Sequence, residues 1–210
     1  MNGRLAIFGG GGHGRVVADC ALACGWSETV IFDDDAALIR SGPWAIAGTG
    51  LDLLANVTEF DGVIVAIGNN SKRLDWHQRL LSAGSRPVTL IHPAATVSPY
   101  TEVGLGSVVL AAAVVTIGAV LGDAVIVNNC ASVNHDCVLD DAVHVAPGAH
   151  LAGGVRVGHG AWVGLGAVVR EYVTIGNRVF IGAGSIVVRS VDDGLTVMGN
   201  PARPIQRQRR

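Results

Sequence analysis

Aliphatic side chains recur every six residues through the second half of this 210-residue chain, without a single slip. The sixteen positions are Val97, Val103, Val109, Val115, Leu121, Val127, Val133, Leu139, Val145, Leu151, Val157, Val163, Val169, Ile175, Ile181 and Val187. An amphipathic helix repeats near 3.6 residues and a half-buried strand repeats at two, so neither explains a period of six. A chain that turns a corner after every short strand does explain it. The spacing therefore predicts a parallel β-helix whose coils hydrogen-bond to one another.

The residues between the aliphatic positions fit such a coil. A second small residue often stands four positions later: Ala113, Ala119, Ala131, Ala149, Ala161, Ala167 and Ser185. One bulky and one small inward side chain per strand would fill a narrow triangular prism. Several glycines directly follow an aliphatic residue, and we expect them at the corners, where a free φ is useful: Gly104, Gly122, Gly158, Gly164, Gly176 and Gly182.

The first ninety residues have a different pattern, in which strand-like apolar runs alternate with helical ones. Strands are expected at 5–9, 29–32, 62–67 and 87–91, and helices at about 15–24 and 71–83. This alternation predicts a small Rossmann-like parallel sheet flanked by helices. We therefore divide the chain into an α/β domain over residues 1–92 and a β-helix over residues 93–210.

The turn after the first predicted strand is rich in glycine. Gly9, Gly11 and Gly14 match a GxGxxG pattern, and Asp33 follows about twenty residues later. Such glycines admit a diphosphate to a helix N-terminus, and the acid binds a ribose hydroxyl. An NAD-dependent enzyme is one reading. Ninety residues make about half of a dinucleotide-binding fold, however, so a diphosphate joined to one nucleoside and one sugar fits the domain better.

The order of these motifs resembles a family of acyltransferases. Gly11-Gly12-His13-Gly14, Asp33-Asp34 and Ile67-Gly68-Asn69-Asn70 with Arg73 precede the hexads. This combination is similar to the hexapeptide-repeat sugar acetyltransferases, in the branch of the sugar-nucleotide 4-amino N-acetyltransferases and the sialic acid O-acetyltransferases. The resemblance implies a left-handed parallel β-helix with eighteen residues per coil, hence roughly five coils here. It also implies that the α/β domain binds the nucleotide sugar and the β-helix binds acetyl-CoA as co-substrate, with no metal.

The resemblance can be carried over residue by residue. For the nucleotide sugar it implies Gly11, Gly12, His13, Gly14, Asp33, Asp34, Gly68, Asn69, Asn70 and Arg73, with Asn128 from the β-helix. For acetyl-CoA we expect His144, Ala152, Gly153, Pro201 and Arg203, the last two within a Gly-x-Pro-Ala-Arg ending typical of the family. A serine that is common in the first loop is Gly11 or Gly12 here, so backbone N–H groups must serve the phosphates.

Polar side chains cluster in one stretch of the repeat, from Asn128 to His144. Acetyl transfer to an amine or hydroxyl needs a base that removes a proton, and histidine suits this because its pKa lies near neutral. His135 stands two positions after an aliphatic residue, where side chains point outward, and is our candidate base. Asp136 is expected to support the imidazole, although it could instead face the core or a corner. His144 completes the predicted catalytic set as a donor to the developing oxyanion.

The spacing of the two histidines carries a further expectation. Nine residues are half a coil, so His135 and His144 lie on opposite sides of the prism, on the order of 15 Å apart. They can share a site only where two subunits meet, and a cyclic homotrimer of prisms provides three such seams. Residue 153 lies one coil above His135 and is a glycine, which would leave backbone groups open to a pantetheine arm. Trp162 and Tyr172 are expected to point outward, as surface or subunit contacts.

Composition limits the partners and the compartment. A net charge of −2 with pI near 6.4 argues against nucleic acid and anionic membranes. We see neither a signal peptide nor an apolar run of membrane-spanning length, and we read the basic tail Arg207, Arg209 and Arg210 as a solvated end. Four cysteines without zinc-ligand spacing fit a reducing cytoplasm, with Cys130 and Cys137 expected at small core positions.

We therefore predict an acetyl-CoA-dependent transferase acting on the 4-amino group of a UDP- or GDP-linked dideoxy amino sugar, for a bacterial surface glycan or glycoprotein. A sugar O-acetyltransferase of the sialic acid type is the alternative. An NAD-binding enzyme and a non-catalytic β-solenoid remain as other classes.

Overall fold

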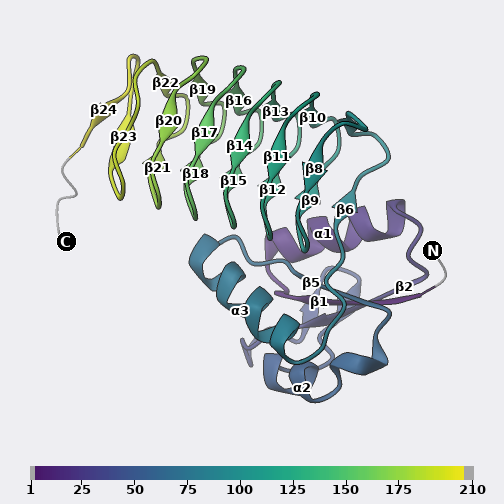
Figure 1. The fold of residues 1–210 in the computed structure, drawn as a ribbon. Coiled ribbons are helices and arrows are strands. Elements are labelled where there is room, and N and C mark those ends of the chain that lie inside the picture. Colours follow the sequence, from purple (N-terminus) through teal and green to yellow (C-terminus); the bar gives the residue numbers. More distant parts are fainter. Residues whose placement is uncertain (1–2, 206–210) are drawn as a thin grey trace.

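The computed structural model describes residues 3–205 as an α/β domain beneath a prism-shaped β-helix (Figure 1). The basic tail Arg207, Arg209 and Arg210 lies outside the described residues. Among the described residues, no helix combines the length and hydropathy that a membrane span requires.

The α/β domain is built on a short parallel sheet with strand order β2-β1-β5. Its strands are β1 (Arg4–Phe8), β2 (Glu28–Phe32) and β5 (Gly62–Val65), and its longer helices are α1 (Gly12–Ala23) and α3 (Asn70–Ser82). Alternate residues of β1 face opposite sides, as a strand requires. Leu5 and Ile7 pack with α1 and with the β-helix, whereas Ala6 and Phe8 pack on the other side of the sheet with Leu53. Helix α1 is thus held between the sheet and the prism.

The predicted strands at 5–9, 29–32 and 62–67 and both predicted helices agree with this domain to within a few residues. The predicted strand at 87–91 is wrong for this sheet, because only 90–91 form a strand and they pair with the prism. The smaller elements of the domain were not anticipated. These are the strands β3 (Arg40–Ser41) and β4 (Trp44–Ala45), the helix α2 (Gly50–Ala55) and a single 3₁₀ turn, η1 (Val57–Glu59). Helix α2 begins with a capping box, in which Thr49 and Asp52 each bond the other's backbone N–H.

The β-helix has three faces of two- or three-residue strands, stacked so that strands up to β22 pair with those eighteen residues away (Figure 1). The spacing falls to sixteen between β21 and β23. The first face contains β6 (Leu90–Ile91), β9 (Val108–Val109), β12 (Ile126–Val127), β15 (His144–Val145), β18 (Trp162–Val163), β21 (Phe180–Ile181), β23 (Thr196–Met198) and β24 (Arg203–Pro204), the last antiparallel. The second face contains β7 (Thr96–Val97), β10 (Val114–Val115), β13 (Ser132–Val133), β16 (His150–Leu151), β19 (Val168–Val169) and β22 (Ile186–Val187). The third face contains β8 (Glu102–Val103), β11 (Val120–Leu121), β14 (Val138–Leu139), β17 (Arg156–Val157) and β20 (Thr174–Ile175).

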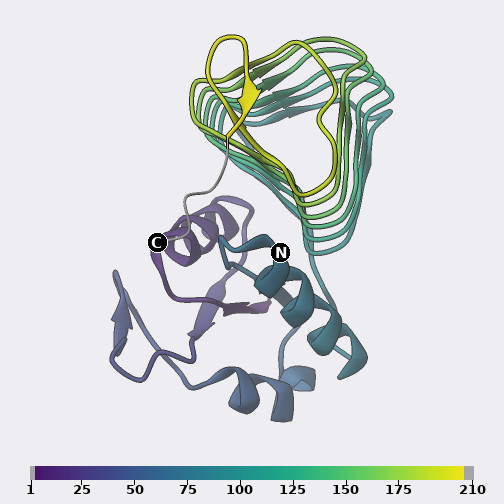
Figure 2. The same cartoon turned by 90° about the vertical axis from the view of Figure 1, so that its left-hand side faces the viewer.

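The hexad register is confirmed as the core of this prism, which is triangular in cross-section (Figure 2). Aliphatic positions from Val109 to Val187 are at most 2% exposed, and the small residues four positions later line the same core. Close packing of one large and one small side chain per strand explains why the repeat tolerates no slip.

The predicted role of the corner glycines is wrong. A left-handed φ recurs every six residues from Gly106 to Gly184, three positions after each aliphatic residue, and it is adopted there by alanine, cysteine, aspartate, tyrosine and arginine as well as glycine. The glycines directly after the aliphatic residues have no such φ. They are required because neighbouring coils approach closely: a Cβ on Gly104 or Gly164 would collide with the backbone of the next coil.

Three further expectations need correction. The prism starts earlier than residue 93, because β6 pairs with β9, and Pro87 makes only an isolated bridge to Val63 of the α/β sheet. The second face has six strands within residues 3–205, so the prism has about six coils rather than five. Cys137 is buried as expected, but Cys130 is exposed at a corner with φ +58°.

Candidate active site

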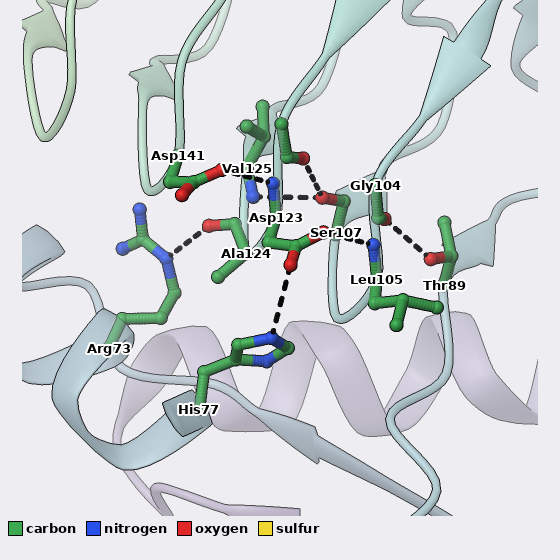
Figure 3. Close-up of polar contacts among 11 residues, drawn as sticks. Arg73, His77, Thr89, Gly104, Leu105, Ser107, Asp123, Ala124, Val125 and Asp141 are labelled. Carbon is green, nitrogen blue, oxygen red and sulfur yellow. Dashed lines mark hydrogen bonds and ion pairs between the residues drawn. The ribbon is translucent and has the colours of Figure 1, made fainter. Parts of the chain in front are cut away.

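Helix α3 binds the α/β domain to the corner between the third and first faces, which we call the third corner. Arg73 is 1% exposed and donates to the carbonyls of Ala124 and Ala142, one coil apart, and to Ile67 in the loop before α3. Asn70 accepts from Arg73 and donates to the Gly160 carbonyl one coil further on. Figure 3 shows the Arg73 guanidinium directed at Ala124. One helix turn therefore bonds carbonyls on three successive coils.

This geometry gives Arg73 and Asn70, which we predicted as substrate residues, a structural role at the junction of the two domains. Both side chains are buried, and the structure uses their donors to join the two domains. Burial lowers the pKa of Arg73 to about 9, which still leaves it charged at neutral pH.

A second contact lies one turn further along α3 (Figure 3). His77 is buried, with Nε2 3.8 Å from the Asp123 carboxylate, and burial lowers its pKa while Asp123 and Asp141 oppose the shift. The same carboxylates bond along the prism: Asp123 accepts from the Leu105 N–H, and Asp141 accepts from the Asp123 N–H. These bonds satisfy corner N–H groups that the strand ladder leaves over.

The glycine loop lies at the carboxyl edge of the sheet, between β1 and α1, and can accept a diphosphate. Gly11 is the N-cap of α1 and Gly12 its first residue; both are exposed, with no side-chain cap and no acidic residue in the first turn. The N–H groups of the first turn therefore remain available to an anion. Gly14, which we predicted as a substrate residue, is buried. A Cβ at this position would collide with the Gly9 carbonyl, so glycine is needed here for the close packing of α1 against the loop.

The predicted acidic residues follow β2, beside this loop. Asp33 accepts from the N–H groups of Gly10 and Asp35, so it shapes the loop rather than standing free for a ribose. Asp34 is exposed and accepts from the Gly50 N–H over 2.8 Å. Asn69 is also exposed and caps α3 by accepting from the Lys72 N–H.

His144 projects from the first face toward the α/β domain of its own chain. It is 4% exposed; its ring lies 4.1 Å from Trp162 and 6.1 Å from His13. The Asn128 amide Nδ2 lies 3.2 Å from His144 Nε2, and Asn128 Oδ1 accepts from the Asn129 N–H. This network makes Nε2 the acceptor and places the proton on Nδ1.

Both histidines are neutral at physiological pH. Burial lowers the pKa of His144 to about 3, with further lowering by the Arg73 charge and by unfavourable coupling to His13. Burial and Arg73 lower the pKa of His13 to about 4. Within residues 3–205, His13 Nε2 is buried and has no hydrogen-bond partner, whereas the His144 ring also contacts the backbone of Gly68. The unpaired His13 nitrogen is therefore a candidate contact for a polar ligand group at the domain junction.

The His135–Asp136 pair lies elsewhere, at the corner between the second and third faces, which we call the second corner. His135 Nδ1 and Asp136 Oδ2 are 2.8 Å apart, with 54% and 73% of the side chains exposed. Asp136 therefore supports the imidazole at a corner with φ +59° and does not face the core. The pair is flanked by glycine: a Cβ on Gly153 would collide with the His135 ring, and one on Gly118 would collide with Asp136.

The predicted cofactor residues have mixed surroundings. The Gly153 carbonyl accepts from the Tyr172 N–H, and the Ala152 carbonyl accepts from the Cys137 thiol. We expected these carbonyls to be open to pantetheine, but both are already hydrogen-bonded. Pro201 and Arg203 are exposed at the far end of the prism. There Arg203, Arg189 and Ser190 line a cavity of about 220 Å³. Arg189 was not among the residues predicted from the sequence.

A second cavity, of about 490 Å³, was also missed. It lies between the Gly68–Ser71 loop and the first face, and is lined by Trp162, Arg178 and Phe180. The rings of Trp162 and Phe180 are stacked 6.1 Å apart. The available signal was the eighteen-residue spacing of His144, Trp162 and Phe180, which places three rings in one column of the first face.

The fold and site define a β-helix acyltransferase that carries a small parallel α/β domain, and comparisons give the family. Residues 4–80 match the PglD N-terminal domain. The chain is 45% identical to the acetyltransferase domain of PglB from Neisseria gonorrhoeae FA1090, solved with acetyl coenzyme A, with a TM-score of 0.94 over 98% of this chain and 100% of that one. It is 38% identical to PerB from Caulobacter crescentus, solved with CoA and GDP-perosamine, with a TM-score of 0.91 over 97% and 98% of the chains. The chain belongs to this family of sugar N-acetyltransferases.

A curated relative points the same way over a shorter stretch. The chain is 38% identical over 116 residues to UDP-N-acetylbacillosamine N-acetyltransferase of Bacillus subtilis (strain 168). That alignment covers 51% of each protein, so the chain spans about half the length of the curated relative it matches.

Replacing Arg73 by lysine should lower the free energy of unfolding by about 2 kcal/mol or more, because an ammonium group cannot reach all the acceptors and each abandoned buried acceptor costs about 1–3 kcal/mol. Urea denaturation measures this. The matched control is Lys72→Ala on the exposed side of α3, expected within about 0.5 kcal/mol of the wild type. Equal effects for both variants would mean that the hydrogen bonds of Arg73 to the prism contribute nothing to the free energy of unfolding.

Acidification should destabilise the fold through His13 and His144. Their folded pKa values lie below the unfolded value near 6.5, so between about pH 6.5 and 4 the unfolded chain binds protons that the folded chain does not. The free energy of unfolding should therefore fall as the pH drops from 7 to 4. His144→Gln should flatten this slope, measured by urea denaturation at each pH, whereas exposed His150→Gln should leave it unchanged. A His144→Gln slope as steep as that of the wild type would contradict the assignment.

Proposed function

We propose that this protein transfers an acetyl group from acetyl-CoA to the 4-amino group of a nucleotide-linked dideoxy amino sugar. The observation that carries the proposal is the hydrogen-bonded His135–Asp136 pair, open to ligand and floored by glycine, on the β-helix of a family whose members include enzymes solved with CoA and GDP-perosamine. The nucleotide diphosphate binds at the N-terminus of α1, where Gly11 and Gly12 offer backbone N–H groups.

The proposed reaction is a direct transfer in a ternary complex. Asp136 accepts from Nδ1 of His135, which leaves the Nε2 lone pair free to act as base. The uncharged amine attacks the thioester carbonyl, and Nε2 takes the proton that the nitrogen loses. The new C–N bond forms as the C–S bond breaks, CoA leaves as thiolate, and the imidazolium, stabilised by Asp136, returns the proton to sulfur or solvent.

His144 takes a different role from the one predicted. Its buried ring adjoins His13 and the backbone of Gly68 in the loop after β5, rather than the second corner, so we assign it with His13 to the sugar end of the substrate. Both rings stay neutral and offer a directed hydrogen bond without a charge to desolvate. Arg203 and Arg189 are assigned to the phosphates of CoA, as cations at the edge of one cavity.

The wild type should release thiol from acetyl-CoA with at least one UDP- or GDP-linked 4-amino sugar. His135→Ala should reduce turnover by about 10²–10⁴-fold, because the reaction loses its general base, while CoA binding changes little. A thiol-release assay over a sugar panel and calorimetry with CoA provide the two measurements. His150→Ala, exposed on the second face, is the control. Undiminished turnover in His135→Ala would remove the base assignment, and transfer to hydroxyl sugars alone would favour O-acetylation.

We further propose a homotrimer in which the base of one subunit acts on the sugar held by its neighbour. His135 and His144 leave the prism from different sides, and the His135–Asp136 pair is more than half exposed in a single chain. A seam between prisms would bring the two halves of the site together.

Complementation tests this arrangement. His135→Ala lacks the base, and Gly11→Val obstructs the exposed phosphate loop, so each should be inactive alone. Because exchange of subunits creates some seams with both halves intact, refolding the two variants together should restore part of the wild-type activity. Light scattering should give the mass of three chains. Activity in a strictly monomeric sample, or no recovery after verified subunit exchange, would sink the shared site.

A further inference from the structure

The second corner carries a column of residue pairs, one pair per coil, in which a second aromatic ring approaches the candidate base. His135–Asp136 is followed one coil later by Gly153–Gly154, and after another coil by Glu171–Tyr172. The three coils are in register, because the Gly154 N–H donates to the His135 carbonyl and the Tyr172 N–H to the Gly153 carbonyl.

The two rings lean toward the same glycine step from opposite directions. A Cβ on Gly153 would collide with the His135 imidazole, and a Cβ on Gly154 would collide with Cδ1 and Cε1 of Tyr172. Adjacent Cα atoms are about 3.8 Å apart, so the imidazole and the phenol cover two neighbouring residues that have no side chains. Nε2 is the atom of the His135 ring that comes nearest to Gly153.

The backbone of Tyr172 has a left-handed conformation that is unusual for a residue with a side chain. Its φ is +56°, which is unfavourable for residues other than glycine, and the residue is 76% exposed. Glu171 is paired with Arg170 at 3.0 Å. The aromatic ring of Tyr172 therefore presents most of its surface to solvent beside the candidate base.

We propose that Tyr172 is a positioning residue for the acyl donor, its ring forming the second wall of a notch that holds the thioester end of acetyl-CoA against His135. This inference rests on the proposed function. The flat ring packs against the thin pantetheine chain, which runs between the exposed parts of the Tyr172 and His135 rings. One coil beyond Glu171 the column reaches Arg189, at the cavity that also contains Arg203, so the donor's phosphates meet cations at the end of the same track.

The test compares Tyr172→Ala with Tyr100→Ala. Tyr100 stands in the same register of the second corner, four coils earlier, and is 73% exposed, but it does not adjoin the glycine step. We expect Tyr172→Ala to raise the KM for acetyl-CoA about tenfold, as loss of a packed ring contact would, with kcat within about threefold and the KM for the nucleotide sugar unchanged. Tyr172→Phe keeps the ring and should behave as the wild type, and Tyr100→Ala should change neither constant.

Calorimetry with CoA alone separates this inference from the proposed function. If the wild type transfers no acetyl group to any sugar, the proposed function fails, yet weaker CoA binding by Tyr172→Ala than by Tyr100→Ala still supports the notch. Equal CoA affinity and equal acetyl-CoA KM for the two alanine variants would overturn it. So would a Tyr172→Ala protein whose oligomer dissociates while its acetyl-CoA KM stays at the wild-type value, since the ring would then be a subunit contact.

Discussion

The structure depends on the bonds that one turn of α3 makes to the third corner of the prism. Arg73 and Asn70 contact the carbonyls of Ala124, Ala142 and Gly160, which stand on consecutive coils, and Arg73 also holds the loop after β5. A guanidinium suits this role because its donors point in fixed directions toward several acceptors. The α/β domain is thereby fixed in height and rotation along the prism, and His13 is brought to His144.

The sequence predicted the fold well because the period of six is a direct imprint of core packing. Each inward position of the prism must be filled by one side chain, so the register can be read from residue types alone. The corner conformation could not be read in this way. Ala112 and Arg178 adopt a left-handed φ that cannot be predicted from their residue types. Gly104 is needed because the neighbouring coil approaches it closely, and that coil is distant in sequence.

The candidate site was predicted in composition more than in arrangement. His135 and Asp136 lie together because they are neighbours in sequence and on one corner. The burial of His144 depends on a contact between residues far apart in the chain, and so does the use of Arg73 and Asn70 as structural donors. No pattern in the hexads reports how the α/β domain sits on them. The column His144–Trp162–Phe180 was available from its spacing and was overlooked.

The alignment of three coils by α3 also determines where such a molecule can grow. An extra coil inserted between Ala142 and Gly160 would move Gly160 by about 4.8 Å along the prism, place the backbone of an inserted residue beside the Asn70 amide, and separate His144 from Trp162. A coil added after Arg178 would leave every hydrogen bond of α3 to the prism in place and would only increase the distance to Arg189 and Arg203. Evolution can therefore adjust the reach of this scaffold at its distal end without disturbing the junction where the two domains meet.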